Sequence, residues 1–236
     1  MKQFLSILLG MILFISCKKA DHTSAKEEAV EKQAIDVSAA RSVSNIGSVT
    51  ICSQVWMQKN LEVTTYRNGD PIPQVTDPNV WMTLTTGAWC YYNNDPATGA
   101  IYGKLYNGFA VHDPRGLAPA GWRIPTNDDW TVLTNCLGGE ILAGGKLKEK
   151  GTKHWAQPNT AATNSSRFTA LPAGSMVAID SRFMNLGLTA NFWSSTLYPF
   201  STTNSYYRRL VYNGGNVQSF GGALHIDGFS VRCIKE

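Results

Sequence analysis

Residues 121–139, GWRIPTNDDWTVLTNCLGG, contain the clearest helix signal in the chain, and the fold class follows from it. Thr126 is a favourable N-cap because its hydroxyl can accept a hydrogen bond from the backbone N–H of Asp129. That carboxylate lies in the first turn, where the helix dipole favours negative charge. Apolar side chains recur at the spacing of one helix face: Trp130, Leu133 and Leu137. Two glycines then provide a flexible end. We therefore predict a helix over about 127–137, entered through an extended or turn segment that ends at Pro125.

The composition limits the class of protein. The chain has 236 residues, a length that suits one domain with appendages. Only 16% of the residues are charged, against roughly 25% in an average soluble domain. The net charge of +4 is small, and no Lys/Arg run exceeds two residues. We therefore expect no nucleic-acid partner, because such partners require a basic patch.

The N-terminus has the form of an export signal. Lys2 is followed by an apolar run over 4–15, which is too short to span a bilayer comfortably. Ser16 and Cys17 follow directly, and this ending resembles the lipobox of a bacterial lipoprotein. We predict a lipoprotein signal over 1–17 with Cys17 as the lipidated residue, and hence an exported protein anchored to the membrane by its acyl chains. The alternative is an ordinary secretory signal with an incidental cysteine.

A polar segment separates this signal from the folded part of the chain. Residues 18–45 contain almost no aromatic or large apolar residues, so they cannot bury enough surface to fold. We predict a disordered tether there and a single domain over 46–236.

The domain is predicted to consist of short strands around the main helix. β-branched and aromatic runs bounded by turn residues predict strands at 48–57, 60–66, 88–92, 168–172, 191–196 and 228–234. Residues 205–212 and 216–220, joined by Asn-Gly-Gly, predict a hairpin. A turn is predicted at 67–73, a short helix within 77–84, and a second short helix interrupted at Gly144-Gly145. The fold class is therefore α+β, with one main helix and short, mostly antiparallel strands.

Nine sequence blocks occur together and in order along the domain. They are 54–61 (QVWMQKNL), 66–73 (YRNGDPIP), 85–95 (TTGAWCYYNND), 102–107 (YGKLYN), 120–126 (AGWRIPT), 143–148 (AGGKLK), 162–166 (ATNSS), 193–196 (WSST) and 228–233 (GFSVRC). Together they resemble the Fibrobacter succinogenes major paralogous domain family. The resemblance implies a C-type-lectin-like fold in a secreted or surface lipoprotein of Bacteroidota or Fibrobacterota, with no established activity.

Two segments depart from the pattern of that family. Gly108 and Phe109 stand where the family often has Trp-Tyr. Residues 221–227, GGALHID, replace a run that is richer in Asn and Lys and contains Tyr.

Four cysteines lie in the domain: Cys52, Cys90, Cys136 and Cys233. An even number in an exported chain favours two disulfides, for which three connectivities exist. Reduced, buried thiols are the alternative. The family resemblance implies a bond from the main helix to the last strand, Cys136–Cys233, and with it Cys52–Cys90.

Chemical motifs are few. The four histidines are far apart in the sequence, and we expect surface or hydrogen-bonded roles for them: His22, His112, His154 and His225. Gln157-Pro158-Asn159 resembles part of a C-type-lectin calcium and sugar motif, but the accompanying Trp-Asn-Asp is missing, which favours a plain turn. No hydrolase, metalloprotease or dinucleotide motif is present. We therefore expect no metal, no cofactor and no enzymatic activity.

The hairpin is the best candidate for a ligand-binding surface. It mixes flat aromatic side chains with adaptable polar ones, a composition typical of contact surfaces. The predicted ligand-binding residues are Tyr206, Arg208, Tyr212, Asn213, Asn216 and Gln218. Strand alternation places Tyr206, Arg208 and Tyr212 on one face, and Tyr207 and Arg209 on the other. The alternative is that these aromatic residues only complete the sheet.

These observations predict a non-catalytic, lipid-anchored binding module of the cell envelope, with a glycan or a surface protein as its partner. It would lie at the outer membrane, facing either the periplasm or the cell surface. One alternative is a structural or adhesin component without a small ligand. Another is an oxidase similar to the formylglycine-generating enzymes, which share the lectin-like fold but use a cysteine pair, whereas Cys233 is the only cysteine near the C-terminus.

Overall fold

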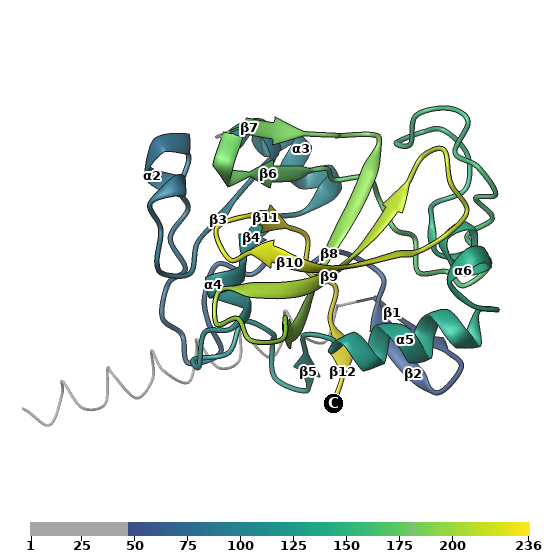
Figure 1. Ribbon diagram of the computed structural model, residues 1–236, viewed down its shortest axis with the longest axis horizontal. Helices are drawn as coiled ribbons and strands as arrows, with labels where there is room; N and C mark the ends of the chain where they lie inside the picture. Colours follow the sequence, from purple (N-terminus) through teal and green to yellow (C-terminus); the bar gives the residue numbers. More distant parts are fainter. Residues whose placement is uncertain (1–46, 181) are drawn as a thin grey trace, which may run out of the picture. The chain divides into compact units, whose positions relative to one another are not determined.

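The computed structural model describes residues 47–180 and 182–236, which belong to one compact unit (Figure 1). The predicted signal over 1–17, the lipidation site Cys17 and the tether over 18–45 lie outside the described residues. Within the described part of the chain, no helix has the length and apolar character that crossing a bilayer requires.

In the described residues, twelve short strands form three sheets, and all pairs between these strands are antiparallel. The first sheet has the order β1 (Ser48–Ile51), β2 (Gln54–Met57), β12 (Ile234–Lys235) and β5 (Trp122–Arg123). The second has the order β10 (Gln218–Leu224), β9 (Asn204–Val211) and β8 (Thr189–Leu197). The third has the order β3 (Trp89–Cys90), β4 (Leu105–Asn107), β11 (Gly228–Phe229), β6 (Ser175–Val177) and β7 (Arg182–Met184). The predicted α+β class with mostly antiparallel strands is confirmed.

The main helix, α5 (Asn127–Cys136), begins and ends close to the predicted residues. Thr126 and Asp129 form a capping box, in which each side chain accepts a hydrogen bond from the other residue's backbone. Trp130 and Leu133 are buried, as the apolar spacing predicts. Consequently α5 fixes one face of the second sheet, because these side chains share a core cluster with Phe192 and Leu210 of that sheet.

The part of the chain that the structure describes has four further α-helices, all shorter: α2 (Pro78–Met82), α3 (Pro96–Tyr102), α4 (Gly108–Val111) and α6 (Glu140–Leu147). The short helix predicted within 77–84 is confirmed as α2. The sequence analysis predicted no helix at α3 or α4. The prediction that Gly144-Gly145 interrupts a helix is wrong, because α6 runs through both residues. A Cβ on Gly144 would lie 2.3 Å from the Asn216 carbonyl oxygen, so glycine is required for close packing there.

Several predicted strands differ in the structure. Residues 48–57 form the β1–β2 hairpin instead of one strand, because Cys52 turns the chain with a positive φ of 52°. Residues 60–66 form no strand, although the Leu61 N–H donates to the Val231 carbonyl at 2.8 Å. Residues 228–234 split into β11 and β12, with Arg232 between them.

Arg232 explains that split, because its guanidinium binds two other segments of the chain, 57–60 and the residues around Phe168. It is fully buried and donates to Asn60 Oδ1, the Met57 carbonyl and the Phe168 carbonyl at 2.6–3.2 Å. The Phe168 carbonyl therefore bonds to a side chain, and the predicted strand at 168–172 is an irregular segment with one bridge, from Ala170 to Lys148.

The predicted disulfides, Cys136–Cys233 and Cys52–Cys90, are wrong. Cys52, in the β1–β2 turn, is bonded to Cys136 at the end of α5, with their Cα atoms 6.6 Å apart. Cys90 and Cys233 are buried free thiols. Ile234 packs in the core cluster that contains α5, so the preceding Cys233 points to the opposite side of the chain, away from the helix. Burial raises the pKa of Cys233 to about 12.

Candidate functional site

The hairpin that we predicted as the ligand surface is confirmed as β9 and β10. Residues opposite one another in neighbouring strands share a face of the sheet, so the pairing divides the side chains into two sets. One face carries Ala190, Phe192, Arg208, Leu210 and Ser219. The other carries Asn191, Trp193, Tyr207, Arg209, Gln218 and Phe220. The predicted alternation of Arg208 and Arg209 is therefore correct.

The predicted role of Arg208 does not fit its position. The side chain is only 2% exposed and lies against the start of α5. Its guanidinium donates to Asn127 Oδ1 at 2.8 Å and to the Asn127 carbonyl at 3.2 Å. Burial lowers the pKa of Arg208. A ligand cannot reach this group while α5 covers it, so Arg208 is a packing residue.

The other predicted ligand residues do not form a single cluster. Tyr206 is half-buried, with its ring 5.4 Å from that of Tyr198. Tyr212 packs against the main core cluster. Asn213 is exposed and Asn216 half-buried in the loop at the far end of the hairpin, where α6 packs against it. Among the six residues, the half-buried Gln218 lies on the face opposite Arg208.

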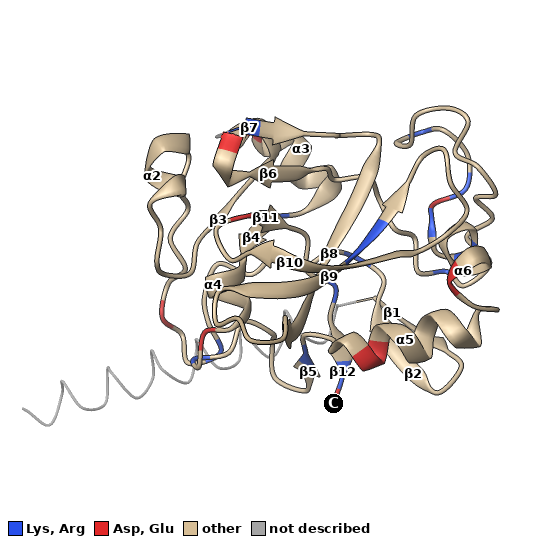
Figure 2. Ribbon diagram, viewed as in Figure 1, with Lys and Arg blue, Asp and Glu red and all other residues tan. Residues whose placement is uncertain are grey.

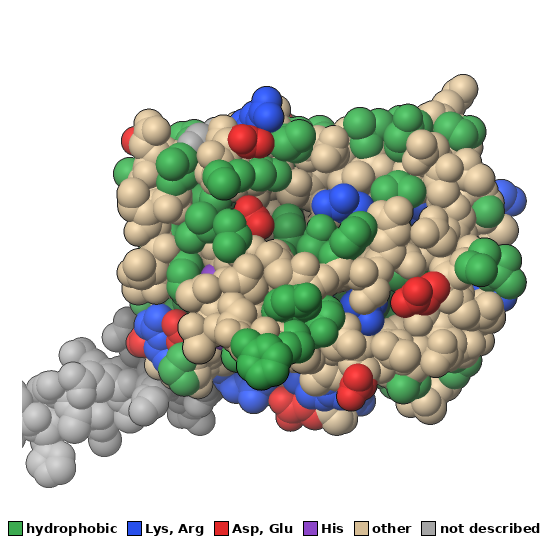
Figure 3. Space-filling view, in the orientation of Figure 1, with side chains coloured by type: hydrophobic (Ala, Val, Ile, Leu, Met, Phe, Trp, Pro, Cys, Tyr) green, Lys and Arg blue, Asp and Glu red, His purple; other side chains and the backbone are tan. Residues whose placement is uncertain are grey.

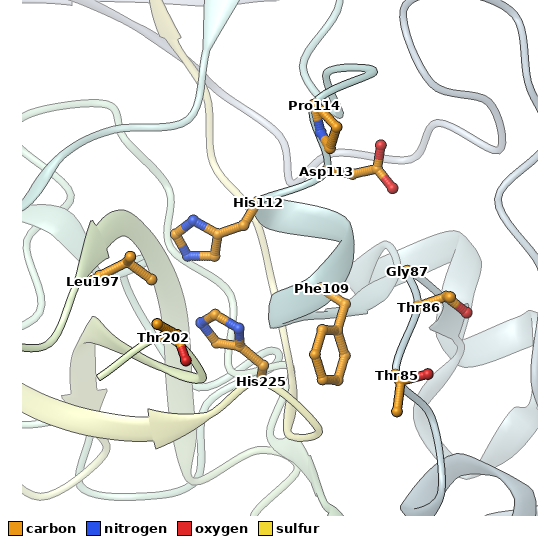
Figure 4. A pocket seen from close by; sticks show the side chains of 10 residues that line it. All are labelled: Thr85, Thr86, Gly87, Phe109, His112, Asp113, Pro114, Leu197, Thr202 and His225. Atoms are coloured by element: carbon orange, nitrogen blue, oxygen red, sulfur yellow. The ribbon is translucent and has the colours of Figure 1, made fainter. Parts of the chain in front are cut away.

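A pocket of about 460 Å³ lies at the other end of the hairpin. It is bounded by the segment before β3, by α4 and the residues after it, by the β8–β9 connection, and by the residue that follows β10. The lining residues are Thr85, Thr86, Gly87, Phe109, His112, Asp113, Pro114, Leu197, Thr202 and His225 (Figure 4).

Two histidines, 113 positions apart in the sequence, meet at this pocket through one serine. His112 Nε2 lies 2.7 Å from Ser205 Oγ, and His225 Nε2 lies 2.9 Å from the same oxygen. The two imidazole rings are stacked, with centroids 4.7 Å apart. One hydroxyl can donate only one proton, so one imidazole accepts from Ser205 while the other donates to it. Phe109 packs edge-on against His225 and separates it from Thr85 (Figure 4).

Local backbone contacts hold this cluster in place. His112 is the C-cap of α4, and Gly108 begins that helix. The Gly108 N–H donates to the His225 carbonyl at 2.7 Å, and the His225 N–H donates to the Thr203 carbonyl at 2.8 Å. A Cβ on Gly108 would lie 2.6–2.8 Å from His225, so only glycine allows this approach.

Burial keeps both imidazoles neutral at physiological pH. It lowers the pKa of His225 to about 4, with a further contribution from the neighbouring His112. It also lowers the pKa of His112. The pocket therefore offers neutral hydrogen-bonding groups beside an aromatic ring.

This Ser–His cluster differs from a nucleophilic triad. Ser205 is fully buried, and within the described residues no carboxylate is bonded to either His112 or His225, whereas a triad needs a reachable hydroxyl and an orienting carboxylate. His154 does have a carboxylate partner, since its Nδ1 lies 2.9 Å from Glu149 Oε2, but neither residue lines this pocket.

Residues 47–180 and 182–236 contain no group of three His, Cys, Asp or Glu side chains placed to hold a metal ion. In the lectin-like tripeptide, the Asn159 amide donates to the Glu149 and Gly151 carbonyls at 2.9 and 2.6 Å. Through these bonds, Asn159 connects the turn that contains the tripeptide to the segment 149–151.

No sequence pattern indicated the pocket, because its histidines are isolated in the chain and each one resembles a surface residue. One feature of the sequence pointed to the pocket indirectly. The two segments that depart from the family pattern, Gly108-Phe109 and 221–227, contact each other here through Phe109 and His225.

The comparisons with known proteins identify the family. The model of the Fibrobacter succinogenes major domain matches residues 49–235, so the chain belongs to that family. No curated protein matches the chain. No solved structure matches it either.

Proposed function

We propose that the domain is a non-catalytic binding module with a C-type-lectin-like fold, and that its pocket binds a saccharide unit of an envelope glycan. The full chain would be exported and anchored in the outer membrane by lipid on Cys17. No role for nucleic acid or for a cofactor is part of this proposal.

The composition of the pocket supports this proposal. Small-ligand sites combine apolar surface with a few well-placed polar groups. Here Phe109 supplies an aromatic ring, and neutral imidazoles and threonine hydroxyls surround it. A sugar ring presents the complementary pattern, with an apolar C–H face and hydroxyls at its edge. The backbone contacts of His225 and Gly108 keep the groups in place, which reduces the entropy lost on binding.

A glycan array with the full-length chain in detergent tests this function. Phe109→Ala should remove the array signal and leave the fold intact, because Phe109 is only partly buried. Phe200→Ala is the matched control, because Phe200 is fully exposed and lies outside the pocket lining. An array without hits, or hits that survive Phe109→Ala, would contradict glycan binding in this pocket.

The lipid anchor requires its own test. Cys17→Ala should move the protein from the membrane fraction to the soluble fraction, because the acyl chains supply the anchoring energy. Mass spectrometry of the N-terminal peptide should find the acyl groups in the wild type. An unmodified peptide from a protein that stays in the membrane would contradict lipidation.

Exposed apolar side chains on and near β8, β9 and β10 support one alternative, a structural or adhesin role through contact with a protein. They are Leu197, Tyr198, Phe200, Phe220 and Leu224. Hydrophobic side chains also gather over β9 and β10 in Figure 3. Apolar surface of this kind marks interaction sites, and a pulldown from native envelope that depends on Phe200 would favour this alternative. The oxidase alternative has less support, because Cys90 and Cys233 are both buried.

A further inference from the structure

A second polar group on the hairpin face lies outside the pocket. Asn191, Arg209 and Gln218 are opposite one another on β8, β9 and β10. We propose that Arg209 and Gln218 bind the carboxylate of an acidic saccharide, whose ring lies on the neighbouring aromatic side chains. This site goes beyond the pocket proposed above, and it shares only the assumption that the ligand is a saccharide.

Arg209 is held in a fixed orientation. Its Nε donates to Asn191 Oδ1 at 3.0 Å, and one of its terminal nitrogens donates to the Tyr207 hydroxyl at 3.0 Å. Asn191 is only 1% exposed and is itself fixed, because its amide donates to the Gly174 carbonyl and Thr189 Oγ1. A guanidinium that is already oriented loses little freedom when it binds a carboxylate.

Arg209 has unused hydrogen-bond donors, and its charge has no ion-pair partner among the described residues. A guanidinium has five N–H groups, and the two bonds above leave the others without a partner among the described residues. Four other arginines have a carboxylate within ion-pair distance: Arg67, Arg115, Arg123 and Arg182. Arg209 has none in the described part of the chain, although it is half-exposed. The charge of Asp227 contributes to raising the pKa of Tyr207, the neighbour of Arg209. Asp227 itself accepts hydrogen bonds from the backbone N–H groups of Ala178 and Leu224.

The neighbouring row of side chains is aromatic. Tyr207 and Phe220 lie opposite one another, with rings 5.3 Å apart and inclined by 22°. Phe220 is 38% exposed, and the Arg209 guanidinium lies 5.0 Å from its ring centre. An acidic pyranose has an apolar ring face and a carboxylate at its edge. The two rows therefore match both parts of such a sugar.

The sheet edge favours a saccharide over an acidic peptide. Peptides commonly bind an exposed sheet edge by adding a strand, which needs a regular ladder. β10 is the edge strand, but its register shifts between Phe220 and Ala223, next to the proposed site. Such a bulge interrupts the row of backbone groups that a peptide would pair with.

Calorimetry on the full-length chain in detergent tests this proposal with three probes: tri-galacturonate, its methyl ester and a Glu-containing tripeptide. The wild type should bind the acid at least about tenfold more tightly than the ester, as expected for one charge-assisted contact. Arg209→Gln should remove that preference, and Arg209→Lys should restore only part of it, because lysine keeps the charge without the planar fork. Arg167→Gln is the control, an exposed arginine outside this face with no side-chain partner among the described residues.

Gln218→Ala provides a second variant in case Arg209→Gln does not fold, and it should lower the affinity for the acid several-fold. Four results would overturn the proposal: no binding of any probe, equal binding of acid and ester, unchanged binding by both variants, or binding of the peptide as tight as that of the acid. Phe109→Ala separates this proposal from the previous one. If it leaves acid binding intact and Arg209→Gln removes it, the site is at Arg209 whatever the pocket does. The reverse result would leave the pocket as the only saccharide site.

Discussion

Arg208 and Arg209 are neighbours on β9, where they form its blue segment in Figure 2, yet they have opposite environments. Arg208 is buried under α5 and bonds to Asn127. Arg209 is half-exposed on the other face and bonds to Asn191 and Tyr207. Residue type and spacing are the same for both, so the difference comes from which face of the sheet the helix covers.

Buried cations are a recurrent device in this domain. Lys148 and Arg232 are also buried, and their hydrogen-bond partners are backbone or amide oxygens. Lys148 donates to the carbonyls of Thr160, Val211 and Gly214 at 2.8–3.0 Å. Burial lowers the pKa of Lys148 to about 8. A basic residue in this sequence can therefore hold loops together through their backbone oxygens, and its presence does not by itself indicate a binding surface.

The largest expected difference between the two faces concerns two phenylalanines. Phe192→Ala should cost about 4 kcal/mol of unfolding free energy, because it leaves a cavity in the core beside Trp130. Phe220→Ala should cost about 1 kcal/mol or less, because the ring is partly exposed. Urea denaturation of both variants measures the difference. Equal losses would mean that the second face is also covered at Phe220, as it is at the buried Trp193.

The disulfide is the next test, because it ties α5 to the β1–β2 turn. The double variant Cys52→Ser/Cys136→Ser should lose about 4 kcal/mol, since the bond joins residues that are 84 positions apart in the sequence. Non-reducing peptide mapping should first show the Cys52–Cys136 peptide. Cys90→Ser is the control, because it leaves this bond in place. A reducing agent should therefore destabilise Cys90→Ser and the wild type by the same amount.

Alanine substitutions at the two arginines compare the faces directly. Arg208→Ala should cost about 2 kcal/mol, because it removes a buried side chain and its hydrogen bonds to Asn127. Arg209→Ala should cost within about 1 kcal/mol, as is usual for side chains at the surface. Thermal unfolding of both proteins provides the measurement. A larger loss for Arg209 would assign its hydrogen bonds to stability and not to ligand binding.

The last expected effect is a pH dependence at the pocket end of the hairpin. His225 has a pKa of about 4 in the folded protein, against about 6.5 when unfolded. The unfolded state therefore binds protons first, and stability should fall as pH falls from about 6.5 to 4, by on the order of 2 kcal/mol. His112, whose pKa is lowered in the same direction, adds to this loss. Denaturation across this pH range should show a weaker slope for His225→Asn, while Phe220→Ala keeps the wild-type slope.

Several elements were predictable because their signals are local. The capping box at Thr126, the apolar spacing of Trp130 and Leu133, and the Asn-Gly-Gly loop of the hairpin each act within a few residues, and all are confirmed. Segments whose partners are distant in sequence were predicted wrongly. Residues 60–66 form no strand, and Asn60 and Leu61 instead bind the chain around 231–232, a pairing that no local pattern contains.

The candidate sites follow the same division. The sequence by itself determined the α+β class, the family, and the assignment of Arg208 and Arg209 to opposite faces, since periodicity is a property of neighbouring residues. Only the tertiary structure decided which face α5 covers, which cysteines come within bonding distance, and that His112 and His225 share one serine. Those outcomes depend on how elements pack across large sequence separations, where burial and shape select the partners and no local residue pattern specifies them.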